Sequence, residues 1–413
     1  MAQHPFLKSI QPVNLLSFGP DTGPIELRPL NILIGPNGGG KSNFIEILRL
    51  LHDLPDKDPW SVVIATGGVS DWIWKGAKGG DVRPSLRVAI SLSDPTGGHT
   101  TSRPRLVDLA ISLDKFDSSF RVVSEMIGTT REDGSRDSLL SWFERSGSQG
   151  EVHLRLARAD AGPIRFDLSA DRSVLSQLTS QPFQLSGAGQ ALPDLFEIAE
   201  FLEKLEFHQD WEFGVDNAAR DPQFVGQSTA RLDEDGANLA QILAYLRDFH
   251  RPTYVRLGEL MTRFYESFES LDVRLIGTHL QPAINEKGGF AVSAPRLSDG
   301  TLRWLALLAI LLNPTPAPVT CIEEPELGLH PDAIHTLADL LVDASTRTQL
   351  IVTTHSDALV DAFSDDPEAV CVCEKVEGST VIRRLDKERL KVWLKDYSLG
   401  HLWMSGEIGG NRW

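Results

Sequence analysis

The chain has 413 residues, of which 41% are hydrophobic and 23% are charged, as is ordinary for a globular protein with a large core. Its formal net charge of -17 argues against a surface that binds nucleic acid throughout, because phosphate contacts need lysine and arginine, although a local basic strip is compatible with it. The longest apolar run, Trp304 to Leu312, is too short to span a membrane. Only three cysteines and no secretion signal predict a cytoplasmic protein without disulfides or a membrane partner.

The first predicted elements are strands, a glycine-rich turn and a helix. Within residues 8–34, the runs Ile25–Leu30 and Ile32–Ile34 predict strands that lead into the turn. Apolar residues then recur at helical spacing from Phe44 to Leu51. Five partly alternating segments follow, separated by turn residues, and predict antiparallel strands: Leu86–Leu92, Arg105–Leu113, Phe120–Glu125, Glu151–Leu156 and Ile164–Leu168. Asp133-Gly134 marks a turn in the polar stretch 127–150.

The apolar period changes in the second half of the chain. Residues 239–246 and 257–264 each place apolar side chains on one helical face, so the stretch from about 192 to 270 predicts a helical lobe. The short apolar runs at 319–322 and 350–353 end in charged or polar residues, as expected of buried parallel strands.

The glycine-rich turn matches GxxxxGK[ST], the pattern of a P-loop that cradles phosphates. Its glycines let backbone N–H groups turn inward as an anion nest, and the helix that follows points its positive end at the same place. The lysine is expected to bridge the β- and γ-phosphates of ATP, and the serine to ligate Mg²⁺. The alternative is a chance glycine-rich turn. The predicted nucleotide-binding residues are Gly35, Pro36, Asn37, Gly38, Gly39, Gly40, Lys41, Ser42 and Asn43.

A pair of carboxylates ends the predicted strand at 319–322. Glu323 is the expected metal ligand, together with Ser42, and Glu324 the expected base that deprotonates the attacking water. An aspartate is commoner than a glutamate at the position of Glu323. The alternative for the pair is a solvated strand end.

Two further motifs lead to a family resemblance. The string Leu297-Ser298-Asp299-Gly300-Thr301 resembles the LSGGQ signature of ABC-type ATPases, although Ser298 or Asp299 could also simply cap a helix. The strand 351–354 ends at His355, which resembles the switch histidine of that family, although a lone histidine is more often structural. The resemblance implies that Ser298, Asp299 and Gly300 act in trans on the nucleotide of a second copy, and that Glu324 and His355 are catalytic.

The four motifs follow the family's order over residues 35–356. The strings at 40–43, 298–303 and 323–331 resemble the RecF/SMC/OLD-like branch, and those at 232–239 and 409–413 resemble stand-alone bacterial predicted AAA-type ATPases within it. This resemblance implies an α/β P-loop NTPase of ABC-ATPase type, with a mixed sheet, an antiparallel β subdomain and an inserted helical lobe. The expected units are residues 1–185, a first ATPase lobe; 186–285, a helical lobe; and 286–413, the rest of the ATPase.

The resemblance implies an ATP- and Mg²⁺-dependent ATPase that forms a homodimer on ATP and serves DNA repair, genome maintenance or anti-phage defence. DNA and a separate nuclease or toxin effector are the further partners, because too few residues follow His355 for the Toprim nuclease domain of some relatives. A regulatory or scaffolding ATP-binding module and a transporter energy subunit remain alternatives. More than half of the chain separates Lys41 from Ser298, which disfavours the transporter.

The sequence leaves two contacts of that family unassigned and suggests one docking surface. No glutamine can be assigned to the Q-loop, and Phe18 is the candidate for the adenine contact. The apolar C-terminal residues Trp393, Leu402, Trp403 and Trp413 either dock a partner or pack on the protein's own core, the latter being the favoured interpretation.

Overall fold

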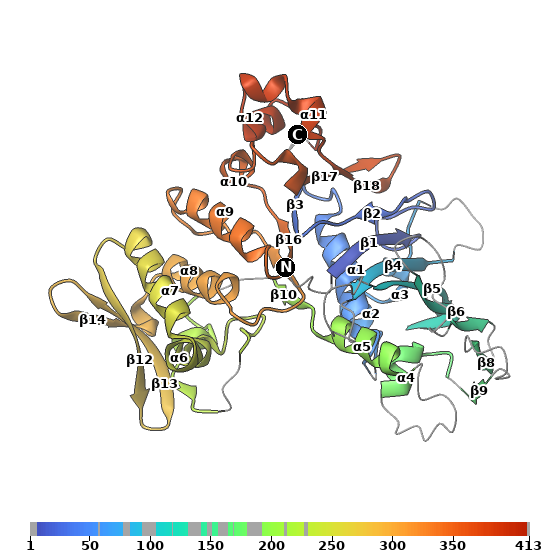
Figure 1. Cartoon of the computed structure of the whole chain (residues 1–413), viewed down its shortest axis with the longest axis horizontal. Helices are drawn as coiled ribbons and strands as arrows, with labels where there is room; N and C mark the ends of the chain where they lie inside the picture. Colours follow the sequence, from blue (N-terminus) through green and yellow to red (C-terminus); the bar gives the residue numbers. More distant parts are fainter. Residues whose placement is uncertain are drawn as a thin grey trace, which may run out of the picture.

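The computed structural model contains three sheets and the helices that cover them (Figure 1). It describes residues 6–56, 58–76, 83–92, 105–117, 119–130, 142–146, 151–155, 164–167, 169–179, 192–209, 213–226 and 230–410. The turn predicted at Asp133-Gly134 and the aromatic residue Trp413 lie outside these ranges. The antiparallel sheet and the helical lobe lie on opposite sides of a central sheet (Figure 1).

The central sheet has the strand order β10-β15-β16-β3-β17-β18, in which only β18 is antiparallel to its neighbour. Its two middle strands are buried over their whole length, which explains their continuous apolar runs. The carboxyl ends of β3, β15 and β16 therefore meet at one edge of the sheet. The strands are β3 (Leu30–Ile34), β10 (Glu206–His208), β15 (Val319–Glu323), β16 (Gln349–Thr353), β17 (Val370–Val376) and β18 (Ser379–Arg384).

Alternate residues of the central strands face two cores, because successive side chains of a strand point to opposite faces. Leu33 of β3 packs in the core that contains α1 (Lys41–Asp53) and the antiparallel sheet. Ile32 and Ile34 pack on the other face, in the core of the helical lobe.

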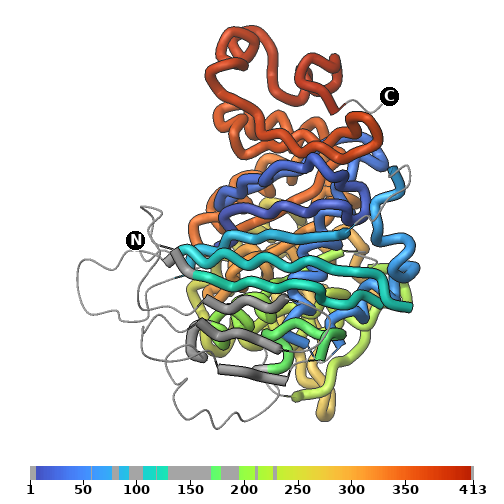
Figure 2. Tube along the Cα trace, turned by 90° about the vertical axis from the view of Figure 1, so that its right-hand side faces the viewer, coloured from blue at the N-terminus to red at the C-terminus, as the bar shows by residue number. Residues whose placement is uncertain are grey.

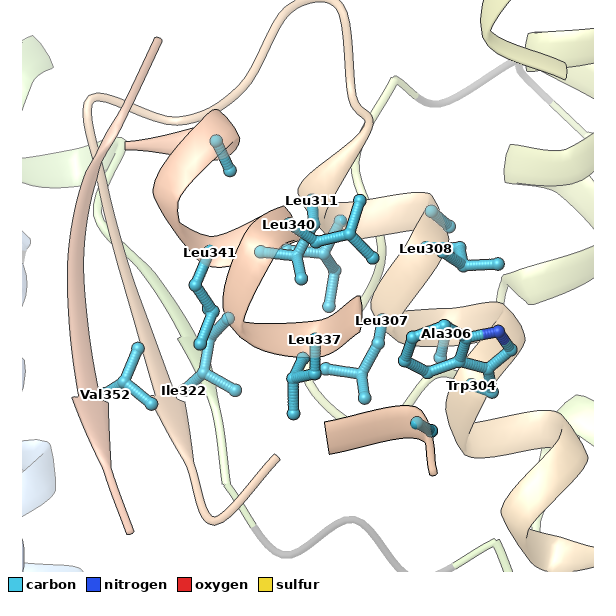
Figure 3. Close-up of a cluster of buried hydrophobic side chains, with 14 of the residues drawn as sticks. Trp304, Ala306, Leu307, Leu308, Leu311, Ile322, Leu337, Leu340, Leu341 and Val352 are labelled. Atoms are coloured by element: carbon cyan, nitrogen blue, oxygen red, sulfur yellow. The ribbon is translucent and has the colours of Figure 1, made fainter. Parts of the chain in front are cut away.

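The second face of the central sheet is covered by α9 (Ala333–Ala344), and α8 (Asp299–Leu311) packs on α9. Figure 3 shows the side chains of Leu307 from α8 and Leu337 from α9 meeting beside Ile322 of β15. This stacking fixes α8, and with it the 297–301 motif, relative to the carboxyl edge of the central sheet.

The antiparallel sheet has the order β2-β1-β4-β5-β6-β7-β8-β9, and Figure 2 shows its blue to teal strands running side by side. It contains the five segments that the alternating patterns predict, with ends that differ by a few residues. Its strands are β1 (Phe6–Val13), β2 (Ile25–Glu26), β4 (Ser85–Leu92), β5 (Arg105–Phe116), β6 (Ser119–Thr130), β7 (Trp142–Ser146), β8 (Glu151–Arg155) and β9 (Ile164–Asp167). The short helices α2 (Ser61–Ala65), α3 (Val69–Trp72), α4 (Val174–Thr179) and the longer α5 (Leu192–Glu203) belong to this side of the molecule.

The helical lobe contains α6 (Leu239–Phe249) and α7 (Arg251–Phe264), the two helices predicted from their apolar spacing. It also contains a small antiparallel sheet that the sequence analysis did not predict, because its strands lack a clean alternation of buried and exposed residues. The strands of that sheet are β11 (Gln223–Phe224), β12 (Phe268–Ile276), β13 (His279–Glu286) and β14 (Phe290–Ser293). The expected domain boundaries stay predictions; α8, which follows the second boundary, packs against α6 and α7.

The C-terminal unit contains α10 (Asp357–Asp361), α11 (Lys387–Leu390) and α12 (Leu399–Met404). Leu402 and Trp403 are buried, and the Trp403 indole N–H donates to the carbonyl of Gly410 at 2.8 Å. These two residues therefore pack on the protein's own core, whereas Trp393 is 45% exposed. Among the described residues, no helix has both the length and the apolar character needed to cross a membrane.

Candidate active site

The loop between β3 and α1 has a backbone that only glycine can adopt at two of its positions. Gly35 has a φ of 148°, and a Cβ there would lie 2.1 Å from the Cys373 carbonyl oxygen. Gly40, which precedes the first turn of α1, has a φ of 103° and would place a Cβ 2.2 Å from Oγ1 of Thr380. The loop thus lies against β17 and β18 and delivers the N-terminal end of α1 to the carboxyl edge of the sheet, where an anion is favoured.

Lys41 is buried although its side chain is charged. Its Nζ donates to the carbonyl oxygens of Gly35 at 2.8 Å and Pro36 at 3.1 Å, so the ammonium folds back over the loop. A buried ammonium requires such hydrogen bonds, because desolvation penalises its charge. The arrangement concentrates positive charge where the backbone N–H groups of α1 begin.

The two predicted carboxylates lie at the end of β15. Glu323 is its last residue, and Glu324 follows with a φ of 42°, in the left-handed region that glutamate seldom adopts. The Glu324 N–H donates to the Thr353 carbonyl at 2.9 Å, which holds the turn beside β16. His355 Nε2 lies 3.6 Å from the Glu324 carboxylate. Strain of this kind is often found at functional sites, where the surrounding structure maintains it.

One cavity of about 390 Å³ brings the predicted groups together. The P-loop residues, the two carboxylates and His355 all contribute to its wall. The described residues that line it are Asn37, Gly38, Gly40, Lys41, Ser42, Asn43, Arg303, Glu323, Glu324, Leu327, Thr353, His355 and Lys375. Gly35, Pro36 and Gly39 shape the loop through backbone contacts instead.

Carboxylates and cations both line the cavity. Burial and the negative charge of Glu323 raise the pKa of Glu46, a half-buried carboxyl of α1, while Arg49 lowers it. Oxygen ligands with concentrated negative charge suit a hard divalent cation, and Ser42 supplies a hydroxyl on the same wall. The residues present therefore fit a phosphate group together with Mg²⁺.

The 297–301 motif reaches the surface at Ser298 and Asp299, whereas Leu297 and Thr301 are buried. Ser298 and Asp299 are exposed, and Ser298 Oγ accepts the Thr301 N–H at 3.1 Å, so the helix cap considered as an alternative is present. Gly300 lies so close to the next loop that a Cβ would meet the Gly328 carbonyl oxygen at 2.6 Å. None of the described cavity-lining residues belongs to 298–300.

Three residues near the site received no role in the sequence analysis. Arg303 of α8 lines the cavity, and its guanidinium lies 3.4 Å from the Glu324 carbonyl oxygen; burial lowers its pKa. Glu326 is buried and accepts hydrogen bonds from Thr354 Oγ1 at 2.5 Å and the His355 N–H at 3.1 Å. Both lie inside strings that carry the family resemblance, 298–303 and 323–331, but neither was assigned a role.

Gln209 is the third missed residue. It follows β10, the strand next to β15, and its Oε1 accepts a hydrogen bond from Arg49 at 2.6 Å. Only the sheet order reveals that this glutamine stands at the carboxyl edge beside the acidic strand. Phe18, by contrast, has no exposed surface and packs edge-to-face on Phe44, so it is not available to stack on an adenine. The prediction for Phe18 is wrong in this structure.

Comparison with known proteins agrees with this geometry. A family profile described as "AAA domain, putative AbiEii toxin, Type IV TA system" matches residues 30–361, which contain all four motifs. The chain belongs to this AbiEii-type AAA family. The fold class predicted from the motifs is confirmed, because the chain shares the fold of Smc head domains. No curated protein matches this AbiEii-type chain.

Two solved structures share the fold of the AbiEii-type chain. One is the crystal structure of the SmcHead bound to the C-winged helix domain of ScpA, with 15% identity and a TM-score of 0.51, covering 93% of this chain and 99% of that chain. The other is the Smc head domain with an extended coiled coil bound to the C-terminal domain of ScpA, derived from Pyrococcus furiosus; it has 14% identity and a TM-score of 0.50, covering 95% and 99%. At such identities the likeness concerns the fold alone.

Proposed function

We propose that this protein binds and hydrolyses ATP with Mg²⁺ and dimerises head to head while ATP is bound. The observation that carries the proposal is the single cavity in which Lys41, Glu323, Glu324 and His355 converge. Membership of an ATPase family supports the same conclusion. The exposed Ser298, outside that cavity, is available to the nucleotide of a second copy.

The P-loop residues bind the phosphates in this proposal. Backbone N–H groups around Gly38 and Gly40, with the first turn of α1, form the anion nest, and Lys41 contacts the terminal phosphates. Ser42 and Glu323 hold Mg²⁺, which neutralises charge on the phosphate oxygens when bound. Gln209 has the place of the Q-loop glutamine, at the carboxyl end of the strand beside the acidic one.

Glu324 acts as general base for the attacking water. Glu324 has a left-handed backbone and lines the cavity. His355 Nε2 lies 3.6 Å from the Glu324 carboxylate. His355 thereby orients the base and contacts the terminal phosphate. Glu326 fixes the His355 backbone by accepting its N–H. A positioned base contributes about 100- to 10,000-fold to the rate of such a step.

The exposed 298–300 loop closes the site of the partner molecule. The N-terminal end of α8 begins at this loop, so its dipole favours the partner's phosphates. ATP stabilises the dimer, hydrolysis releases it, and the two states make a switch. We further propose a cytoplasmic role in DNA repair, genome maintenance or anti-phage defence, with a separate effector. Support comes from the toxin-related family description and from the Smc heads, which are bound to ScpA domains in their structures.

Replacing Glu324 by glutamine tests the proposal. The Glu324→Gln variant should retain ATP, because its cavity loses the base and keeps the P-loop, and it should elute as a dimer with Mg²⁺ and ATP. Light scattering after size exclusion gives the mass with ATP, with ADP and without nucleotide. Glu269→Gln, at an exposed glutamate of β12, is the matched control and should keep wild-type turnover.

A monomeric Glu324→Gln protein at saturating ATP would refute the composite site. A dimer without measurable turnover by the wild type would favour the regulatory module instead. Lys41→Ala should abolish nucleotide binding in a calorimetric titration, and unchanged binding would remove the phosphate cradle from the proposal.

A further inference from the structure

Arg220 lies in the helical lobe with its side chain almost fully buried. The guanidinium donates to five backbone carbonyls and one carboxylate, from two stretches of chain. From the first stretch it reaches the carbonyls of Phe213 at 2.8 Å and Gly214 at 2.9 Å. From the second it reaches the carbonyls of Leu297 at 2.7 Å, Ala294 at 3.2 Å and Pro295 at 3.5 Å, and the carboxylate of Asp299.

These hydrogen bonds fix the conformation of the backbone that leads into the 297–301 motif. The carbonyls of 294–297 turn inward to the guanidinium, and Ser298 and Asp299 consequently stand at the surface. The planar fork of an arginine suits such a set of acceptors, whereas the single point charge of a lysine cannot reach them all. Removing the guanidinium would take one hydrogen-bond donor away from each of these carbonyls, which weakens the hold on this backbone.

Asp299 stands where the LSGGQ signature has its first glycine, and the structure explains the difference. Its carboxylate pairs with Arg220, although the Asp299 side chain is 69% exposed. The pair joins the first helical residue of α8 to a chain stretch 79 residues earlier. The aspartate at this position therefore has a defined partner, the guanidinium of Arg220.

We propose that Arg220 is a positioning residue for the trans-acting loop: it holds residues 294–299 so that Ser298 and the Gly300 N–H face the phosphate of the partner copy. This inference rests on the proposed head-to-head site. It assigns Arg220 an effect on the partner's nucleotide and none on the nucleotide of its own subunit.

A cis effect is the physical alternative. Phe213, one of the Arg220 partners, packs beneath Gly236, where an added Cβ would lie 3.0 Å from its ring. Glu234, in the same loop as Gly236, pairs with Arg49 of α1 at 2.8 Å. Loss of Arg220 could therefore disturb α1, which begins at the P-loop of the same chain. The two routes are separable because they damage different sites of a dimer.

Mixing two inactive variants of the full chain separates the routes. Arg220→Lys leaves the P-loop functional but should misplace the trans-acting 298–300 loop. Lys41→Ala disables the P-loop but leaves the trans-acting loop in place. In the mixed dimer, one site combines the Arg220→Lys P-loop with the intact loop of the Lys41→Ala chain. We expect each variant alone to lose at least about tenfold of its ATPase activity, the factor that about 1.4 kcal/mol corresponds to. The mixture should recover activity well above the sum of the two.

One control pair and one single variant make the outcomes distinct. Ser298→Ala mixed with Lys41→Ala tests the composite site itself, and its failure to recover activity would refute the proposed function along with this inference. Recovery with Ser298→Ala but not with Arg220→Lys would overturn only the role of Arg220. Full ATPase activity of Arg220→Lys alone would overturn it as well.

Matched variants address folding. Arg247→Lys alters a different, partly buried arginine of the lobe, which donates to the Val273 carbonyl at 2.9 Å and to Asp248, and it should keep wild-type activity. If Arg220→Lys does not fold, Asp299→Asn replaces it, because Asp299 is largely exposed. Asp299→Asn should weaken the ATP-dependent dimer of the Glu324→Gln background about tenfold by the same conversion, with ATP affinity of the dilute monomer unchanged. An unaltered dimer, or a weakened monomer affinity, would contradict the positioning role.

Discussion

Replacing Gly40 by alanine should weaken nucleotide binding far more than the same change at Gly38, two residues earlier in the loop. Both glycines have positive φ, 103° and 75°, so each alanine strains the backbone by about 1–2 kcal/mol. A Cβ on Gly38 meets no atom within 4 Å, whereas one on Gly40 lies 2.2 Å from Thr380 Oγ1 and 2.6 Å from Thr380 Cγ2. Only the Gly40 variant therefore displaces a neighbouring side chain.

The magnitude follows from the bonds of Thr380. Its hydroxyl contacts Ser17 Oγ at 2.7 Å and the Gly39 carbonyl at 3.2 Å, and displacement loses about 1 kcal/mol for each bond. Gly38→Ala should thus cost about 1–2 kcal/mol, or roughly 5- to 30-fold in affinity. Gly40→Ala should cost about 3–4 kcal/mol, or roughly 100- to 1,000-fold.

Calorimetric titration with ADP and Mg²⁺ measures both affinities without interference from turnover. Thr380→Ala removes the two atoms nearest to the new Cβ, so Gly40→Ala should cost less in that background than in the wild type. Equal losses for Gly38→Ala and Gly40→Ala, or no coupling between positions 40 and 380, would refute this account of the loop. Circular dichroism of each variant checks that the fold is retained.

Two further predictions concern stability. Burial raises the pKa of the Glu326 carboxyl above its ordinary value of 4.5, so this group keeps its proton at a higher pH in the folded protein than in the unfolded chain. Its contribution to stability is therefore fully present below pH 4.5 and is lost as the pH rises through the pKa of the folded state. The wild type should therefore lose stability relative to Glu326→Gln between pH 4.5 and neutrality in urea unfolding, and a constant difference would contradict this. Leu307→Ala should reduce the free energy of unfolding by about 3–5 kcal/mol, because Leu307 is fully buried between α8 and α9 (Figure 3). The half-exposed Val342→Ala on α9 should change it by less than about 0.5 kcal/mol, and similar losses for both would exclude this packing role.

The proposed switch has its trans-acting loop and its base on helices and strands that share one core. Trp304 and Leu307 of α8 pack in the same cluster as Ile322 of β15 (Figure 3). A displacement of the acidic strand end would therefore be transmitted to the start of α8 through packed side chains, because close-packed cores deform little. This rigidity suits a site whose two halves must meet those of a second copy.

The amino-acid sequence by itself determined the elements whose chemistry is local. The run from Gly35 to Ser42 predicts a phosphate nest because successive glycines and one helix start lie within a few residues, and the strand before it is recognisable from its apolar run. The pair Glu323-Glu324 and the residue His355 were likewise predicted to act in the site, since each lies at or just beyond the end of a short apolar strand. Turn and strand patterns also predicted most of the antiparallel sheet.

The tertiary structure alone decided which distant residues complete these local motifs. Only the order of the central sheet places Gln209 beside the acidic strand, and only packing buries Phe18. Arg220 meets Asp299 across 79 residues of chain, and Arg303 reaches the cavity from α8, whose core lies on the face of the central sheet opposite to α1. No local spacing encodes such contacts, because they arise from how α8, α9 and the central strands share one buried core rather than from the conformation of any single segment.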